Sequence, residues 1–83
     1  MSIQGKILIV DDDPSIRSTL KEVLSRESYQ VVAAGSGEEA LSVMRGTSFD
    51  LALLDLKMAG MDGLSLMKEI RRRSPFTGII MLT

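Results

Sequence analysis

Aspartates occur at two separated points of the sequence, and each point coincides with the end of a short apolar segment. Asp11, Asp12 and Asp13 follow the segment 6–10, and Asp55 closes the segment 51–55. Carboxylates that are brought together repel one another, and one of them takes up a proton unless a cation lies among them. Such oxygen ligands favour Mg²⁺, which binds through one or two carboxylates together with phosphate oxygens. The pattern therefore indicates a magnesium site for phosphoryl chemistry, provided that folding brings the two points together.

The residue types that are missing narrow the chemistry further. The chain has no histidine and no cysteine, which excludes a Ser-His triad, a thiol nucleophile and a disulfide framework. It also lacks a Gly-Lys-Ser/Thr phosphate loop, so the available nucleophile is a carboxylate. Asp55 is the favoured candidate because it stands alone at its segment end. The hydroxyl of Thr83, at the end of another apolar segment, is suited to contact an incoming phosphoryl oxygen.

Each of these aspartates also has an ordinary structural interpretation. A single Asp after a strand is commonly a turn residue or a helix cap, and we expect Asp13 to be a cap. Asp50 and Asp62 are also expected to be turn or cap residues. The joint occurrence of acids at the ends of two strand-like segments favours the functional interpretation for Asp11, Asp12 and Asp55.

Four apolar segments are expected to form the strands that position these side chains. They are rich in Ile, Val and Leu and do not alternate with polar residues, as is typical of parallel strands buried on both faces. The segments are 6–10, 29–34, 51–55 and 78–83.

Helical patterns lie between the strands. Apolar residues recur at helical spacing at Ile16, Leu20, Val23 and Leu24, and again at Leu66, Met67 and Ile70. Pro14 after Asp13, and the capping box Ser36-Gly-Glu-Glu39, predict two helix starts, and Ser74-Pro75 predicts an end.

The resulting order, β-α-β-α-β-α-β, predicts an α/β fold with right-handed crossovers and a parallel sheet that carries helices on both faces. Binding sites in such sheets form at the carboxyl ends of the strands. If the first and third strands are neighbours, three or four carboxylates converge there.

Length and composition limit the number of domains and the kinds of partner that the chain can have. Eighty-three residues allow one small domain, 1–83. A net charge of -1 argues against a nucleic-acid binder that relies on bulk charge. No apolar run approaches a membrane span and the N-terminus has no signal-peptide pattern, so a soluble cytoplasmic protein without nucleic-acid or membrane partners is expected. Arg71-Arg72-Arg73 is interpreted as a solvated helix end.

Taken together, four segments resemble the receiver domain of bacterial response regulators. They are Ile7–Arg17, Gly35–Leu41, Asp50–Gly63 and Ile79–Thr83, and the resemblance extends over most of the chain, from Lys6 to Thr83. It implies a flavodoxin-like, doubly wound parallel sheet with strand order 2-1-3-4. It also implies a phosphorylation-dependent switch that controls an output such as transcription, and hence a regulatory domain rather than an enzyme.

The resemblance also implies a role for each site residue. Asp55 would accept a phosphoryl group from a phosphohistidine on a sensor histidine kinase or a phosphotransfer protein. Asp11, Asp12 and Asp55 would bind Mg²⁺, together with the backbone carbonyl of Lys57. Thr83 would be the switch hydroxyl that turns toward the phosphoryl group.

Two departures from the family accompany the resemblance. Ala59 stands where the family commonly has proline, so we expect a more mobile loop there. The family continues with a further helix, strand and helix after the fourth strand. The resemblance therefore implies that this chain is an N-terminal portion with impaired switching. A partly bare sheet face and an open edge strand would favour self-association or domain swapping.

Two other functions remain open at this point. The chain could be a structural or interaction module whose acids bind no metal, which a Mg²⁺ titration would reveal. It could also be a phosphatase of the haloacid-dehalogenase type that uses Asp11-x-Asp13. That function would leave Asp55 unexplained and would show sustained turnover of phosphate esters. The sequence does not indicate a cognate kinase, a stimulus or an output domain.

Overall fold

The computed structural model describes residues 5–58 and 60–82. In chain order the elements are β1 (Gly5–Val10), α1 (Pro14–Arg26), β2 (Tyr29–Ala34), α2 (Gly37–Met44), β3 (Leu51–Asp55), α3 (Gly63–Arg73) and β4 (Gly78–Leu82). All strand pairs are parallel, and the sheet order is β2-β1-β3-β4. The predicted α/β class, element order and strand order are therefore confirmed. Within the described part of the chain, no helix is long and apolar enough to cross a membrane.

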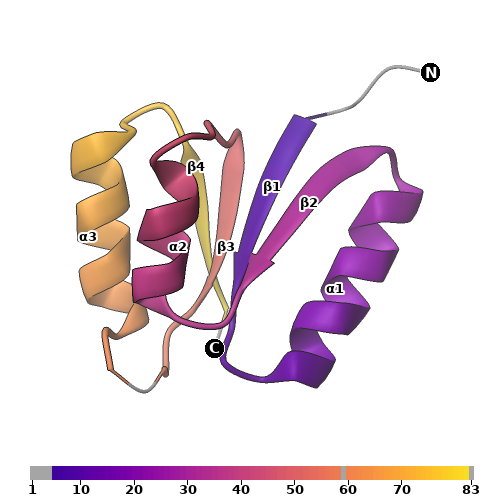
Figure 1. Ribbon diagram of the computed structural model, residues 1–83, viewed down its shortest axis with the longest axis horizontal. Coiled ribbons are helices and arrows are strands. Elements are labelled where there is room, and N and C mark those ends of the chain that lie inside the picture. Colours follow the sequence, from indigo (N-terminus) through magenta and orange to yellow (C-terminus); the bar gives the residue numbers. More distant parts are fainter. Residues whose placement is uncertain (1–4, 59, 83) are drawn as a thin grey trace.

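The helices cover the two faces of the sheet unequally. Figure 1 shows α1 on one side of the sheet and both α2 and α3 on the other. The larger apolar core lies under α2 and α3, and its fully buried members include Leu8, Leu54, Leu66 and Ile70. A smaller core lies under α1 and centres on Ile7, Ile9 and Leu53. Burial of strand residues on both faces therefore fixes β1 and β3 in the centre of the sheet.

Each helix begins after a residue whose side chain accepts a backbone N–H group, as capping requires. The pairs are Ser15 N to Asp13 Oδ1 at 2.9 Å, Glu39 N to Ser36 Oγ at 3.1 Å, and Ser65 N to Asp62 Oδ1 at 2.7 Å. The predicted roles of Asp13, Ser36 and Asp62 are confirmed. Asp50 accepts the Lys6 N–H at 2.8 Å, so it ties the start of β1 to that of β3.

The expectation that all four strands are buried on both faces is wrong for β4. This strand forms one edge of the sheet, and Ile80 is 49% exposed. On that face α1 packs over β1 and β2, so it does not cover β4. The predicted apolar side of α1 is only partly buried. Leu20 and Leu24 pack against the smaller core, whereas Ile16 and Val23 are exposed.

The first residue of α3 makes an unusually close backbone contact. A Cβ atom on Gly63 would lie 2.2 Å from the Asp55 carbonyl oxygen and 2.8 Å from Leu56 Cα. Both atoms belong to the backbone and cannot rotate away, so only glycine permits this approach of helix to strand end. Gly63 thereby sets the position of α3 relative to Asp55.

We predict that Gly63→Ala lowers the free energy of unfolding by at least about 2 kcal/mol, because the added methyl group must push α3 away from β3. Gly46→Ala is the matched control, since a Cβ there meets nothing within 4 Å. Urea denaturation of both variants measures the difference. Equal stability of the two would contradict the close contact.

Candidate functional site

Three carboxylates from two strands meet at one end of the sheet. β1 and β3 are parallel neighbours with Val10 opposite Leu54, so Asp11 and Asp55 come out at the same edge. One oxygen atom from each of Asp11, Asp12 and Asp55 lies within 4.8 Å of the others. Asp11 is buried, Asp55 is half-buried and Asp12 is exposed. The convergence expected from the sequence is therefore present, whereas Asp13 is occupied as the cap of α1.

Three hydrogen bonds hold the backbone and the side chain of Asp11. Its backbone N–H donates to the Ala34 carbonyl at 3.2 Å, and its Oδ1 accepts the Asp13 N–H at 2.9 Å. Its own carbonyl accepts Nη1 of Arg17 at 2.7 Å. The loop after β1 is thus fixed to β2 and to α1, which leaves the Asp11 carboxylate little freedom to move away from its neighbours.

Arg17 extends from α1 to the loops at the ends of β1 and β2. Besides its bond to Asp11, its guanidinium lies so close to Gly35 that a Cβ there would be 3.1 Å from Nη1. The absence of a side chain at Gly35 therefore leaves room for the Arg17 guanidinium. Sequence analysis missed this contact, because the spacing of Arg17 along α1 does not reveal that its side chain turns back over the loop.

Asp55 is held in place by backbone contacts of the two residues that directly follow it. The Lys57 N–H donates to Asp55 Oδ1 at 3.0 Å, and the Leu56 N–H donates to the Leu82 carbonyl at 3.0 Å. The predicted metal-binding role of the Lys57 carbonyl stays a prediction. Thr83, the expected switch hydroxyl, and Ala59, the expected site of greater mobility, lie outside the described residues.

The acid cluster is electrostatically unfavourable by itself. Burial raises the pKa of the Asp11 carboxyl, and the neighbouring carboxylates of Asp55, Asp12 and Asp13 add to the rise, against the opposing effect of the Asp13 N–H. The cluster offers only carboxylate oxygens, the donors that suit a hard divalent cation. Oxygens that share one Mg²⁺ lie at most about 4 Å apart, and the three cluster oxygens lie within 4.8 Å of one another. The donor set therefore fits a small divalent cation.

Comparison with known proteins identifies the family. The sequence model of the response regulator receiver domain matches residues 7–83. The chain belongs to this family. Receiver domains are the regulatory domains of two-component systems, so the candidate site lies in a regulatory domain.

The receiver-domain relatives are mostly longer proteins. The chain is 41% identical over 88 residues to the transcriptional regulatory protein AruR of Pseudomonas aeruginosa, covering 100% of this chain and 36% of that protein. It is 45% identical over 80 residues to the transcriptional regulatory protein ResD of Bacillus subtilis, covering 96% and 33%. The chain therefore spans about a third of the length of these relatives.

A solved receiver-domain structure has the same fold. The response regulator TrrA of Thermotoga maritima, crystallised in complex with Mg²⁺-BeF, superposes with a TM-score of 0.90 at 44% identity. The match covers 96% of this chain and 70% of that one. The arrangement of strands that brings the aspartates together is thus one that a solved relative also has.

We predict that Asp11→Asn raises stability at neutral pH in the absence of divalent cations, by an amount on the order of 1 kcal/mol. A carboxyl whose pKa is raised by folding destabilises the folded state wherever it is ionised, and asparagine removes that charge while its Oδ1 can still accept the Asp13 N–H. Thermal unfolding measures the change.

Asp62→Asn is the control of opposite sign for this prediction. The pKa of Asp62 is lowered, mainly by the Ser65 N–H that its carboxylate accepts, so removing this charge should give no stabilisation. A destabilising Asp11→Asn substitution, or equal stabilisation by both substitutions, would show that the acid cluster is not under strain.

We predict that Arg17→Ala and Gly35→Ala each lower the free energy of unfolding by about 1 kcal/mol. The double variant should lose less than the sum of the two single losses. Both changes disturb the same contact, because the methyl group at position 35 displaces the guanidinium that Arg17→Ala removes. Urea denaturation of the cycle measures the coupling. Arg17→Ala combined with the open-site change Gly46→Ala should be additive, and additivity of both pairs would refute the contact.

Proposed function

We propose that this receiver domain is a phosphorylation-dependent switch in which Asp55 accepts a phosphoryl group. The observation that carries the proposal is the convergence of the Asp11, Asp12 and Asp55 oxygens within 4.8 Å at the carboxyl edge of a receiver-family sheet. Asp55 is half-buried, so an incoming donor can reach its carboxylate. The downstream output is transcription control, as the names of AruR and ResD suggest.

Mg²⁺ is the proposed cofactor, held by Asp11, Asp12, Asp55 and the backbone carbonyl of Lys57. When bound, the ion supplies positive charge that offsets the charge of the cluster and of a phosphoryl group. Asp11 is suited to hold the ion because its backbone is fixed by the bonds to Ala34 and Arg17. The structure of TrrA with Mg²⁺-BeF supports the choice of metal.

The phosphoryl donor in this proposal is a phosphohistidine on a sensor histidine kinase or a phosphotransfer protein. Residues 1–83 contain no histidine, so they do not supply the donor themselves. A carboxylate oxygen of Asp55 forms a bond to phosphorus, and the phosphorus–nitrogen bond of the donor breaks with its electron pair left on the imidazole. The product is an acyl phosphate on Asp55 and a free histidine on the donor.

The remaining assignments follow from the same proposal. Thr83 is the hydroxyl that would respond to the phosphoryl group. Residues 1–83 are proposed to form the N-terminal portion of a receiver domain.

Self-association of the chain is proposed from the edge position of β4 and the 49% exposure of Ile80. Sedimentation over a concentration series measures it.

We predict that a small phosphodonor with Mg²⁺ produces a single hydroxylamine-sensitive phosphoryl adduct on the protein, detected by intact mass. Asp55→Asn should abolish the adduct, because an amide is a poor nucleophile for this step. Asp62→Asn should leave it in place, since Asp62 is the exposed cap of α3. Removing Mg²⁺ with a chelator should lower the yield at least about tenfold.

Two results would reject the proposed function. An adduct that survives Asp55→Asn would assign the phosphoryl group to another residue. Sustained release of phosphate over many turnovers would instead indicate a phosphatase.

A further inference from the structure

The outer face of α3 combines positive charge with exposed apolar side chains. Leu64, Lys68, Arg71 and Arg72 are exposed and stand at the spacing that places residues on one side of a helix. The opposite side of α3 carries Leu66 and Ile70, which are fully buried in the core. Among the described residues, these four side chains therefore lie outside the packed core. Together with Phe76 in the following turn, it is called here the α3 surface.

Phe76 is 98% exposed, far more than any other large apolar residue among those described. A rigid turn presents it. The Thr77 N–H donates to the Ser74 carbonyl at 3.1 Å, and the two hydroxyls are 2.7 Å apart. Thr77 is buried and its hydroxyl donates to the Phe49 carbonyl at 2.8 Å. The aromatic ring is thus held out from a fixed backbone, which lowers the entropy lost when a partner covers it.

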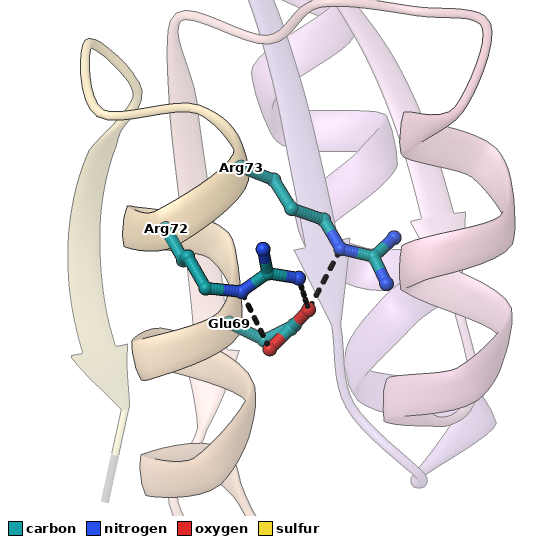
Figure 2. A network of polar contacts seen from close by, with 3 residues as sticks. All are labelled: Glu69, Arg72 and Arg73. Atoms are coloured by element: carbon teal, nitrogen blue, oxygen red, sulfur yellow. Dashed lines mark hydrogen bonds and ion pairs between the residues drawn. The ribbon is translucent and has the colours of Figure 1, made fainter.

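Glu69 holds two arginines in place and offsets one of their two positive charges. Figure 2 shows its carboxylate bonded by two arginines, from Arg72 Nη2 to Oε1 at 2.5 Å and from Arg73 Nε to the same oxygen at 2.8 Å. These arginines lower the pKa of Glu69 to about 2, so it stays ionised at neutral pH. Arg71 and Lys68 make no ion pair within the described residues. The helix keeps an excess of positive charge on its outer side.

We propose that the α3 surface is a docking site for an acidic polypeptide segment that also carries apolar side chains. Arginines and aromatic residues are enriched where proteins bind one another, and Leu64 and Phe76 lie at the two ends of the cationic stretch. An acidic segment would pair with Lys68 and Arg71 while its apolar residues cover these two side chains. Only Leu64 lies near the carboxyl edge, next to Gly63. None of the three acids of the cluster belongs to the α3 surface, so binding of the peptide does not require phosphorylation at Asp55.

Charge and shape favour a polypeptide over the two other anionic partners. A single-stranded nucleic acid needs several aromatic platforms along a basic groove, and this surface offers one aromatic ring. An anionic membrane needs a continuous apolar helix face to enter the lipid, whereas the outer face of α3 is interrupted by Lys68, Arg71 and Arg72. These two partners are therefore included as comparison arms of the test.

The test uses the full 83-residue chain and a fluorescein-labelled synthetic helical peptide with glutamates and leucines on one face. We expect saturable binding by fluorescence anisotropy, weakened by salt, with NMR shift changes centred on residues 64–76. Phe76→Ser and Arg71→Glu should each weaken binding at least about tenfold. Because both side chains are exposed, thermal unfolding should show that these variants remain folded.

Matched controls are available on α1. Val23→Ser removes a side chain from a residue that is 50% exposed, and Lys21→Glu reverses an exposed charge; both should bind the peptide like the unmodified chain. The proposal is overturned if the peptide does not bind up to about 1 mM, or if the control variants weaken binding equally. It is also overturned if oligothymidine or phosphatidylserine vesicles bind the α3 surface more tightly than the peptide.

Discussion

Mutual repulsion among three carboxylates is the constraint around which this molecule is arranged. Asp11, Asp12 and Asp55 lie together because β1 and β3 are parallel neighbours whose carboxyl ends coincide. Burial of Asp11 and the carboxylates beside it raise the pKa of its carboxyl group, so gathering these acids costs free energy in the absence of a cation. The apolar strands β1 and β3 hold the charges there, since moving the acids apart would expose the core.

The loops around the cluster are organised to resist that repulsion. Arg17 bonds the Asp11 carbonyl and lies against Gly35, so one side chain connects α1 with the ends of β1 and β2. On the other side, Gly63 lets α3 approach the Asp55 carbonyl to a distance that no side chain would allow. These contacts position Asp11 and Asp55, whose carboxylates also accept the backbone N–H groups of Asp13 and Lys57.

Helix α3 extends from the carboxyl edge of the sheet, where Asp55 lies, to the opposite edge. Its first residue, Gly63, contacts the backbone of Asp55, and its last turn carries the arginines that share Glu69 (Figure 2). The helix therefore contacts the strand end that carries Asp55 and also carries the charged residues of the α3 surface, although the acid cluster itself belongs to the ends of β1 and β3.

Local patterns in the sequence were sufficient for most of the fold. The runs 29–34 and 51–55 are strands with the predicted bounds, and Asp13, Ser36 and Asp62 cap helices as expected. These features depend on short-range periodicity and on hydrogen bonds within one turn, which residue type and spacing reveal directly. The exposure of β4 was not predictable in this way, because it depends on which strand lies at the edge and which face a helix covers.

The sequence by itself determined the alternation of strands and helices and the placement of acids at strand ends. Only the tertiary structure decided that Arg17 holds the Asp11 loop, that Gly63 fits against Asp55, and that Phe76 stands fully exposed on a fixed turn. Each of these depends on contacts between residues that belong to different elements, such as the Thr77 hydroxyl and the Phe49 carbonyl. Such contacts follow from the packing of the whole chain, which no local spacing encodes.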